Sequence, residues 1–228
     1  MKLFLIKSLS IFFTFGFCFG QTYKINGKIK DLKTDSLLIL KFKGDNIEAS
    51  KIKVNKGKFV YKDTISEPYF IQILKIKKGT NETNGKLADI LIEPGNLYIV
   101  GKSDNYDSIK ISGSKSDLIL KKYLKEDEAL SKKWDSLKLI YDDFVSKGDT
   151  LNSKKTGKEL NYITLGLRVP LLKSYVQNYN NEIIGALIPN FCTLKEILKK
   201  EDYLEMFNFL TDKIKKTSYG KSVYIRTK

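Results

Sequence analysis

The hydrophobic pattern of this sequence changes its period at Ser112-Gly113, and this change most limits what the chain can fold into. From Thr22 to about Ser112, short apolar or alternating runs are separated by turn residues, which is typical of β-strands. Beyond Gly113, apolar residues recur every three or four positions, which is typical of helices. The sequence therefore predicts an α+β fold: an N-terminal antiparallel β-sandwich or open barrel followed by a helical module.

The β-rich half contains regularly spaced candidate strands. They cover Tyr23 to Lys30 on either side of Asn26-Gly27, Leu37 to Phe42, Lys51 to Val54, Phe59 to Tyr61, Tyr69 to Leu74, Ala88 to Ile92, Leu97 to Val100 and Ile109 to Ile111. Asn55-Lys56-Gly57 predicts a hairpin between the strands that flank it, because glycine supplies the positive φ that such a turn needs. Pro94-Gly95 predicts a second turn, while Gly79 to Gly85 is expected to be a polar loop.

The helical half opens with a long amphipathic helix. Its apolar stripe is broken only by Asp127, and Ser114 or Ser116 is the expected N-cap. Lys147-Gly148-Asp149 should end it. The stripe consists of Leu120, Tyr123, Leu130, Trp134, Leu137, Tyr141 and Phe144. We expect this stripe to pack within the chain; the alternative, a coiled-coil partner, would require a longer uninterrupted repeat.

Further helical segments follow this helix. One runs from about Lys155 to Tyr179 and should be kinked by Pro170, which removes a backbone donor. Asn180-Asn181 is expected to cap the next helix, and two short helices should complete the chain. The expected bounds of these three are Glu182 to Ile188, Leu194 to Lys200 and Tyr203 to Lys215.

The first twenty residues have the pattern of a secretory signal peptide. Lys2 and Lys7 precede a short apolar run, Leu9 to Phe17, and cleavage is predicted between Gly20 and Gln21. The run is too short to favour the alternative of a membrane anchor. A lipoprotein acylated at Cys18 is also disfavoured, because Phe17 stands where a small residue is needed. The expected organisation is a signal peptide (1–20), a β-rich domain (21–113) and a helical module (114–228), with no transmembrane segment in the mature chain.

The net charge of +15, or +13 once Lys2 and Lys7 are removed, could indicate a polyanionic partner. The positive charge is scattered, however, and nearly all of it is lysine. Nucleic-acid surfaces usually concentrate their charge and use arginine for bidentate contacts. The sequence therefore predicts a solvated surface and no nucleic-acid partner, with a polyanion-binding site as the alternative.

Two absences limit the possible chemistry. The sequence has no histidine, which removes the usual general base near neutral pH and the Ser-His and Cys-His nucleophiles. Beyond Gly20 its one cysteine is Cys192, so an intrachain disulfide, a CxxC pair and a cysteine-cluster metal site are excluded from the mature chain. Phe191 and Leu194 flank Cys192, which favours burial of its thiol. We predict no catalytic residue, no cofactor and no metal.

Four local motifs resemble functional sites and have simpler interpretations. The loop from Gly79 to Lys86 has a phosphate-loop outline but the wrong spacing. Ser50-x-x-Lys53 lies in a candidate strand, and Ser218-x-x-Lys221 lies in a segment expected to end a helix, so neither places Ser and Lys as a catalytic pair requires. Acidic neighbours such as Asp142-Asp143 are expected on helical surfaces. A glycosidase built from two distant carboxylates stays open as a minor alternative.

Several short motifs together resemble domain-of-unknown-function family 4369, which is common in exported proteins of Bacteroidota. They are Tyr23-x-Ile25-x-Gly27-x-Ile29, Phe59-x-Tyr61, Pro68-Tyr69-Phe70, Glu93-Pro94-Gly95-Asn96-Leu97, Ile111-Ser112-Gly113-Ser114, Tyr179-Asn180-Asn181 and Ser218-Tyr219-Gly220-Lys221. The resemblance implies that such chains continue into a thioredoxin-like domain with a CxxC pair. This sequence ends at Lys228 before such a domain, so the redox activity is not carried over.

These observations favour an exported, non-enzymatic module that binds or positions an unknown protein or envelope ligand in the periplasm or at the outer envelope. The alternative is a truncated or split member of a thioredoxin-like thiol-disulfide oxidoreductase family that lacks its redox domain.

Overall fold

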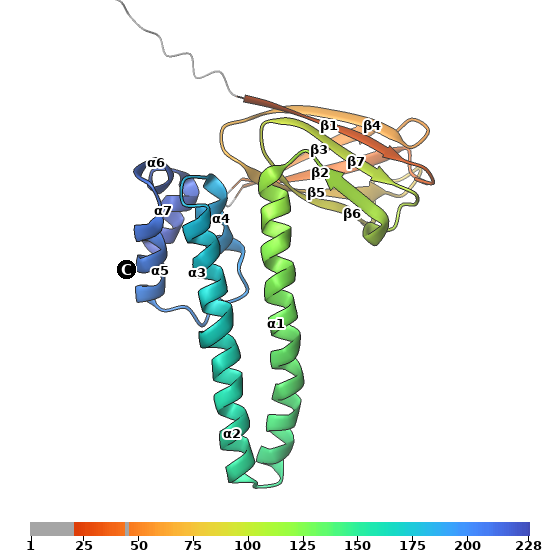
Figure 1. The fold of residues 1–228 in the computed structure, drawn as a ribbon. Coiled ribbons are helices and arrows are strands. Elements are labelled where there is room, and N and C mark those ends of the chain that lie inside the picture. Colours follow the sequence, from red (N-terminus) through yellow and green to blue (C-terminus); the bar gives the residue numbers. More distant parts are fainter. Residues whose placement is uncertain (1–20, 44–45) are drawn as a thin grey trace, which may run out of the picture.

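A computed structural model describes residues 21–43 and 46–228. Two four-stranded sheets pack face to face in the N-terminal part, and helices form the rest of the chain (Figure 1). The predicted α+β class, with a sandwich followed by helices, is confirmed. The predicted signal peptide, residues 1–20, lies outside the described residues, and Gln21 is the first residue of strand β1.

The strands divide between the sheets in the orders β4-β1-β7-β8 and β3-β2-β5-β6. Their bounds are β1 Gln21–Ile29, β2 Ser36–Lys43, β3 Asn46–Lys53, β4 Lys58–Ile65, β5 Tyr69–Ile76, β6 Thr83–Ile92, β7 Gly95–Gly101 and β8 Ile109–Ser112. Side chains at alternate positions face the other sheet, and Ile25, Ile39, Ile71, Ile90 and Leu97 are fully buried there. The strand periodicity in the sequence therefore reflects one buried and one outward face.

One strand pair differs from the antiparallel arrangement that the sequence predicts. β1 pairs with β7 in parallel, with Ile25 opposite Leu97. The chain reaches β7 from the other sheet through Glu93-Pro94-Gly95, so β7 enters beside β1 in the same direction instead of folding back on β6. The other pairs are antiparallel.

The prediction that Asn55-Lys56-Gly57 joins two paired strands in a hairpin is wrong. The turn itself forms, with positive φ at Lys56 and Gly57, but β3 joins β2 while β4 joins β1 in the other sheet. β4 is held on β1 because Phe59 lies opposite Gly27, where a Cβ atom would overlap the Phe59 ring. β1 accordingly runs through Gly27 without a break.

The helical module begins with a long helical hairpin that projects from the sandwich (Figure 1). α1 (Lys115–Ser146) descends, and α2 (Thr150–Asn161), a π-helical segment (Tyr162–Arg168) and α3 (Val169–Asn178) return beside it. The smaller helices are α4 Ile183–Phe191, α5 Lys200–Phe209, α6 Asp212–Lys215 and α7 Ser218–Ile225. α4 and α5 pack against α3, and α6 and α7 pack against α4. The apolar stripe of α1 faces α2 and α3, as the packing interpretation predicts.

Several predicted helix details are corrected by the structure. Ser114 caps α1, as expected. The irregularity expected at Pro170 lies before that residue: a π-helical segment ends at Arg168, immediately before α3. Residues 193–197 form turns where the sequence predicts a helix from Leu194 to Lys200, and the predicted helix from Tyr203 to Lys215 is divided at Leu210-Thr211. Glu182 stands at the N-cap of α4 in place of Asn180-Asn181. These ends depend on packing, which local propensity does not include.

The two turns that carry the family resemblance meet in space. The Glu93 carboxylate accepts hydrogen bonds from the backbone of Lys115 and from that of Ser116, at 3.3 Å in the second case. Gly113 has φ +98°, and a Cβ atom there would overlap the carbonyl oxygen of Asn96. The Glu-Pro-Gly turn therefore satisfies the free N–H groups at the start of α1.

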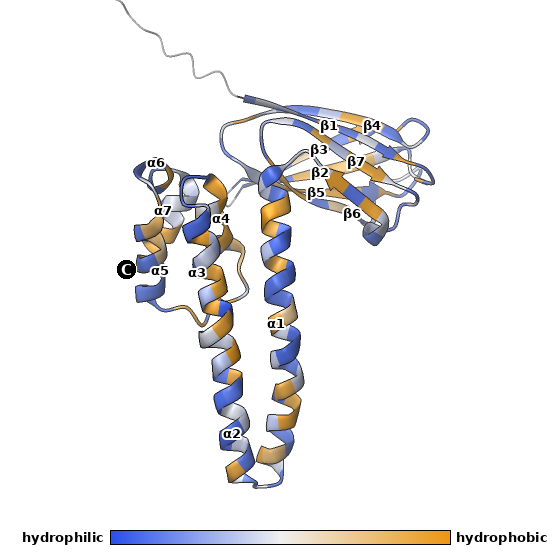
Figure 2. Cartoon of the chain, viewed as in Figure 1, coloured by the Kyte–Doolittle hydropathy of each residue, from blue (hydrophilic) through white to orange (hydrophobic). Residues whose placement is uncertain are grey.

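A second apolar core lies within the helical module and joins it to the sandwich. Tyr123, Leu172, Leu187 and Met206 are fully buried in it, and Leu91 of β6 belongs to the same cluster. Figure 2 shows hydrophobic segments of α1, α3 and α4 facing this region. The helices thus pack partly against the outer face of the β3-β2-β5-β6 sheet.

Candidate binding cleft between the two modules

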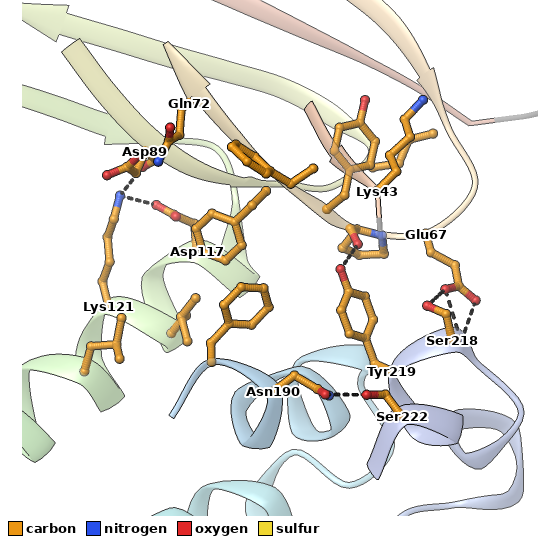
Figure 3. A pocket seen from close by; sticks show the side chains of 18 of the residues that line it. Lys43, Glu67, Gln72, Asp89, Asp117, Lys121, Asn190, Ser218, Tyr219 and Ser222 are labelled. Carbon is orange, nitrogen blue, oxygen red and sulfur yellow. Dashed lines mark hydrogen bonds and ion pairs between the residues drawn. The ribbon is translucent and has the colours of Figure 1, made fainter. Parts of the chain in front are cut away.

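A cleft of about 1250 Å³ lies where the outer face of the β3-β2-β5-β6 sheet meets the helices (Figure 3). Its walls come from β2, β5 and β6, the connection after β4, and α1, α4 and α7. The lining residues are Phe42, Lys43, Thr64, Ile65, Ser66, Glu67, Pro68, Tyr69, Phe70, Gln72, Asp89, Tyr106, Asp117, Leu120, Lys121, Leu124, Asn190, Phe191, Lys195, Ser218, Tyr219, Ser222 and Arg226.

The floor of the cleft is aromatic. Phe42 and Phe70 are cross-strand partners on the outer face of the sheet, since their neighbour Ile71 points into the core. The ring of Phe191, at the end of α4, lies 4.6 Å from the ring of Phe70 at an interplanar angle of 45°. Phe191 is 38% exposed, so this apolar surface is open to an occupant.

The α1 end of the cleft is held by the first turn of that helix. Ser114 Oγ donates to the carbonyl of Leu91 at 2.8 Å, and the Leu91 N–H donates to Asp117 at 3.0 Å. β6 is an edge strand, and these bonds satisfy backbone groups that no further strand covers. Lys121 Nζ then lies 2.6 Å from the second oxygen of Asp117 (Figure 3). The start of α1 is therefore fixed to the sandwich.

Asp89 lies beside this turn and has one unused oxygen. Its Oδ2 is 2.5 Å from Lys86 Nζ and accepts from the Tyr106 hydroxyl at 3.1 Å. Its Oδ1 is buried and has no hydrogen-bond partner in the described part of the chain. Burial, with a further contribution from Asp89, raises the pKa of Tyr106 to about 12. Tyr106 is therefore a protonated hydrogen-bond donor at neutral pH.

The opposite end of the cleft joins the sandwich to α7. The Glu67 carboxylate accepts from the Ser218 backbone at 3.2 Å and also from its hydroxyl, as Figure 3 shows. Tyr219 Oη donates to the carbonyl of Pro68 at 2.8 Å. Burial and the nearby Glu67 charge raise the pKa of Tyr219 to about 12. Contacts at both ends thus hold the cleft walls in place.

The helical wall carries two cations, Lys195 and Arg226. Arg226 donates to the hydroxyl of Tyr203 at 3.1 Å, and its guanidinium lies over that ring at 5.5 Å. Among residues 21–43 and 46–228, neither cation has a carboxylate within ion-pair distance. Ser222 donates to Asn190 at 2.6 Å on the same wall. The wall therefore offers positive charge to a ligand.

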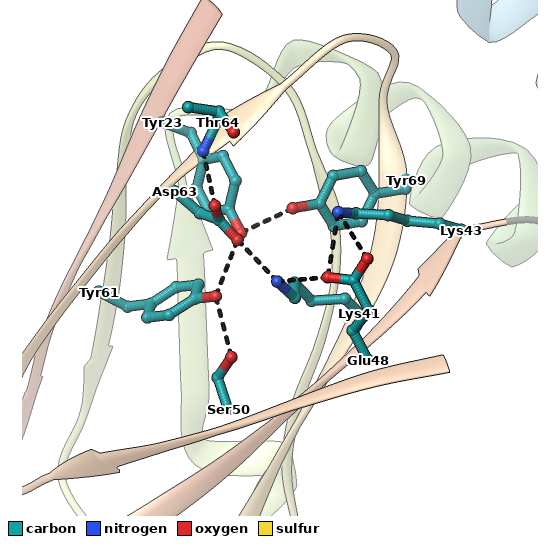
Figure 4. A network of polar contacts seen from close by, with 9 residues as sticks. All are labelled: Tyr23, Lys41, Lys43, Glu48, Ser50, Tyr61, Asp63, Thr64 and Tyr69. Carbon is teal, nitrogen blue, oxygen red and sulfur yellow. Dashed lines mark hydrogen bonds and ion pairs between the residues drawn. The ribbon is translucent and has the colours of Figure 1, made fainter. Parts of the chain in front are cut away.

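A second polar cluster lies between the sheets at the adjoining end of the sandwich (Figure 4). The Lys41 ammonium is buried and lies 2.7 Å from Glu48 and 2.8 Å from Asp63, and Tyr61 donates to Asp63 at 3.0 Å. Burial acts to lower the pKa of Lys41, but the bonds to Asp63 and Glu48 outweigh it and the pKa is raised. For Asp63, burial is likewise outweighed by Lys41, and its pKa is lowered.

These shifts move the pKa values of Lys41 and Asp63 further from neutral pH. Tyr23 and Tyr69, whose hydroxyls are 2.9 Å apart, both have raised pKa values, chiefly through burial. A general acid or base works best with a pKa near the operating pH. The cluster therefore has the properties of a structural ion-pair network that closes one end of the sandwich.

Two of the motifs singled out in the sequence contribute one residue each to these places. Ser50-x-x-Lys53 lies in β3, and Ser50 accepts from the Tyr61 hydroxyl at 3.4 Å in the second polar cluster (Figure 4). Asp142-Asp143 lies on the projecting part of α1, where Lys138 and Lys147 pair with the two carboxylates. Ser218-x-x-Lys221 starts α7 instead of ending a helix, and Ser218 lines the cleft through its bonds to Glu67.

The remaining sequence predictions concern the Gly79–Gly85 loop, Cys192 and metal ligands. β6 already begins at Thr83, so the loop is shorter than predicted. Cys192 is buried, as predicted, and burial raises the pKa of its thiol. In the part of the chain that the structure describes, acidic and cysteine side chains form no group of three that could hold a metal ion. Nor does any helix in that part have the length and apolarity needed to cross a bilayer.

Sequence reasoning missed the cleft residues Phe191 and Arg226 and the buried Arg168. One signal was present: the chain contains only two arginines, Arg168 and Arg226, among many lysines. Where composition favours lysine so strongly, an arginine marks a position that uses the planar guanidinium. Arg168 forms a buried bidentate pair with Asp127, and Arg226 stacks on Tyr203 at the cleft.

The fold and the cleft define a two-module α+β protein with an open groove between its modules. Residues 23–120 match the family described as "Domain of unknown function (DUF4369)". The match extends from β1 into α1 and includes Leu91, Glu93 and Ser114, the residues that join them. The family resemblance is therefore confirmed for this segment. No curated protein matches the chain.

Proposed function

We propose that the chain is an exported, non-enzymatic binding module of the bacterial envelope and that the cleft between its modules is the binding site. The cleft itself is the observation that carries this proposal. It combines an open aromatic floor, which can bury an apolar group of a ligand, with polar and charged groups along its walls, which can fix the orientation of that ligand.

The titratable groups of the cleft support binding more than catalysis. The raised pKa values of Tyr106 and Tyr219 keep both hydroxyls protonated near neutral pH. The chain has no histidine to act as a base. Each hydroxyl already donates its proton within the chain, Tyr106 to Asp89 and Tyr219 to the Pro68 carbonyl, so toward a ligand each can only accept a hydrogen bond.

A retention experiment tests this function. The chain from Gln21 to Lys228 is immobilised and exposed to envelope extract, and retained proteins, lipids and glycans are identified by mass spectrometry. The cleft variant Phe191→Glu is compared with Leu151→Glu, the same change at an exposed position on the projecting hairpin. We expect at least one component to be retained by the wild type and by Leu151→Glu but not by Phe191→Glu. If Phe191→Glu retains every component that the wild type retains, the cleft is not the binding site.

Export is tested separately by cell fractionation and N-terminal sequencing. The charged and apolar pattern of residues 1–20 supports cleavage before Gln21 and a location in the periplasm or at the outer envelope. We expect the isolated chain to begin at Gln21. A cytoplasmic chain that still begins at Met1 would contradict export.

The family resemblance of the sequence motifs implies one second candidate. The chain would then be a truncated or split member of a thioredoxin-like thiol-disulfide oxidoreductase family whose redox domain is encoded separately or lost. The DNA that follows the Lys228 codon distinguishes the two functions. A CxxC-containing domain there, in frame or frameshifted, favours the second candidate, and an unrelated gene favours the binding module.

A further inference from the structure

We propose that the cleft binds an extended peptide segment that places a large apolar side chain on Phe70 and Phe191 and a neighbouring carboxylate against Lys195 and Arg226. This inference rests on the binding function proposed above and assigns its ligand class. It is carried by the shape of the cleft, the open aromatic floor and the distribution of unpaired charge.

The floor selects an apolar group. Phe42, Phe70 and Phe191 meet there from a strand pair and a helix end, and the partly buried Leu124 of α1 extends the same surface. Aromatic rings bury a large area in a partner and prefer tilted or offset contacts, such as the one that Phe70 and Phe191 already make. A Phe, Tyr, Leu or Met side chain of a ligand has the size to cover this surface.

The size of the cleft favours a peptide over a compact small molecule. Sites for small molecules typically measure about 300–1000 Å³ and enclose most of their ligand. This cleft measures about 1250 Å³ and runs from the Asp117 end to the Glu67 end along the junction of two modules. A cleft of that volume, open along the junction, has room for several residues of extended chain.

Two of the three acidic residues of the cleft are paired with cations of the chain. Asp117 pairs with Lys121 and Asp89 pairs with Lys86, whereas Glu67 accepts from Ser218 and keeps its charge. Lys195 and Arg226 have no carboxylate partner in the described ranges. The helical wall that carries these two cations is therefore positive, which complements a carboxylate.

Arg226 is also held in position for a bidentate contact. Its stacking on Tyr203 and the hydrogen bond to that hydroxyl use one of the five guanidinium N–H donors. The remaining donors match the planar geometry of a carboxylate. Lys195 adds a second positive charge on the same wall.

Gln72 supplies a group for the peptide backbone. It lies on the outer face of β5, between the aromatic floor and Asp89, and Figure 3 shows it at the α1 end of the cleft. Its side-chain amide makes no hydrogen bond within residues 21–43 and 46–228. An amide both donates and accepts, as recognition of a peptide unit requires.

The test uses peptide selection followed by measured affinities. Random 12-residue peptides are displayed against the folded chain from Gln21 to Lys228, and a selected peptide is synthesised with a fluorophore for polarisation titration. We expect the selected sequences to share a large apolar residue within three positions of Asp or Glu. Replacing that acid by its amide should weaken binding at least tenfold, a measurement that requires no change to the protein.

The matched protein variants are Lys195→Glu/Arg226→Glu and Lys200→Glu/Lys213→Glu. Both make the same change of charge in the helical module, but only the first pair lines the cleft. We expect the first to weaken binding at least tenfold, with the neutral pair Lys195→Gln/Arg226→Gln in between, and the second to bind within twofold of wild type. Equal binding by both charge-reversed proteins, or selected peptides without acids, would overturn the proposal.

The outcomes also separate this inference from the function on which it rests. If no peptide is enriched while an envelope lipid or glycan is retained by the wild type and lost with Phe191→Glu, the ligand class is wrong and the binding function stands. If neither experiment yields a cleft-dependent ligand, both proposals fail.

Discussion

Arg168 forms two hydrogen bonds with Asp127, of 2.7 and 2.9 Å, and both side chains are buried. Thr193 completes the cluster, since it lies 2.7 Å from the Asp127 carboxylate and 2.6 Å from the guanidinium. Asp127 is the residue that interrupts the apolar stripe of α1, and Arg168 is the last residue of the π-helical segment. The interruption is therefore the point at which α1 is joined to the helix beside it.

Removing one partner of this pair should destabilise the chain strongly. Asp127→Ala leaves the Arg168 charge buried, and such changes typically cost about 3–5 kcal/mol. Urea unfolding at neutral pH measures the effect. Asp142→Ala, which removes an exposed pair with Lys138, is the control and should cost less than about 1 kcal/mol.

The double variant Asp127→Leu/Arg168→Met should recover most of the stability, because apolar residues of similar size replace both charges. A cost for Asp127→Ala no greater than that for Asp142→Ala would show that the buried pair does not hold the helices together.

The Lys41–Asp63 pair should make stability depend on pH at the acidic end. The pKa of Asp63 is below its ordinary value of 3.8, so its contribution is present above about pH 4 and is lost as the pH falls through the folded pKa. The pKa of Lys41 is raised above 10.5, so its contribution is present below about pH 10 and is lost as the pH rises through the folded pKa.

Asp63→Asn should therefore lower the free energy of unfolding by about 1–3 kcal/mol at pH 7, because Lys41 is buried. Urea denaturation of both proteins at pH 7 and below pH 3 measures this difference, and it should shrink at the lower pH. A difference that stays constant across this range would contradict the assigned direction of the Asp63 shift.

Gly57 should tolerate substitution less well than Gly79. Both have positive φ, +71° and +78°, which costs a residue with a Cβ atom about 1–2 kcal/mol. At Gly57 the added atom would also overlap the carbonyl oxygen of Ile29, which is part of β1, whereas nothing lies near Gly79. We expect Gly57→Ala to lose at least about 1 kcal/mol more than Gly79→Ala in thermal or urea unfolding. Equal losses would mean that the turn between the sheets adapts freely.

Cys192 should be unreactive while the chain is folded. Its side chain is buried and its pKa is raised by burial, so little reactive thiolate is present at pH 8. We expect a thiol reagent such as Ellman's to label it in guanidinium chloride but more than tenfold more slowly in buffer. Cys192→Ser serves as the blank. Rapid labelling of the folded chain would indicate that the turn at 193–197 opens readily.

Much of the local structure could be predicted from the sequence. The change of period at Ser112-Gly113 locates the end of β8 and the start of α1, and Ser114 is the N-cap that its position suggests. The apolar flanks of Cys192 correctly predict its burial. Periodicity, caps and turn residues act over a few positions along the chain, so a single sequence carries them.

The partners of each element could not be predicted in this way. Lys56-Gly57 makes the same turn whether β3 and β4 pair with each other or belong to different sheets. The pairing of β4 with β1 depends on distant contacts, such as the fit of Phe59 over Gly27. For the same reason, the sequence shows Asp127 only as an interruption of an apolar stripe, and the structure is needed to identify Arg168 as its partner.

The sequence by itself determined which stretches are strands or helices, the boundary between them and the absence of imidazole chemistry. Only the tertiary structure decided which strands share a sheet and that Phe70, Phe191 and Arg226 line one cleft. Burial of apolar surface favours compaction but is not directional, so the choice of partner depends on how distant surfaces fit when they meet.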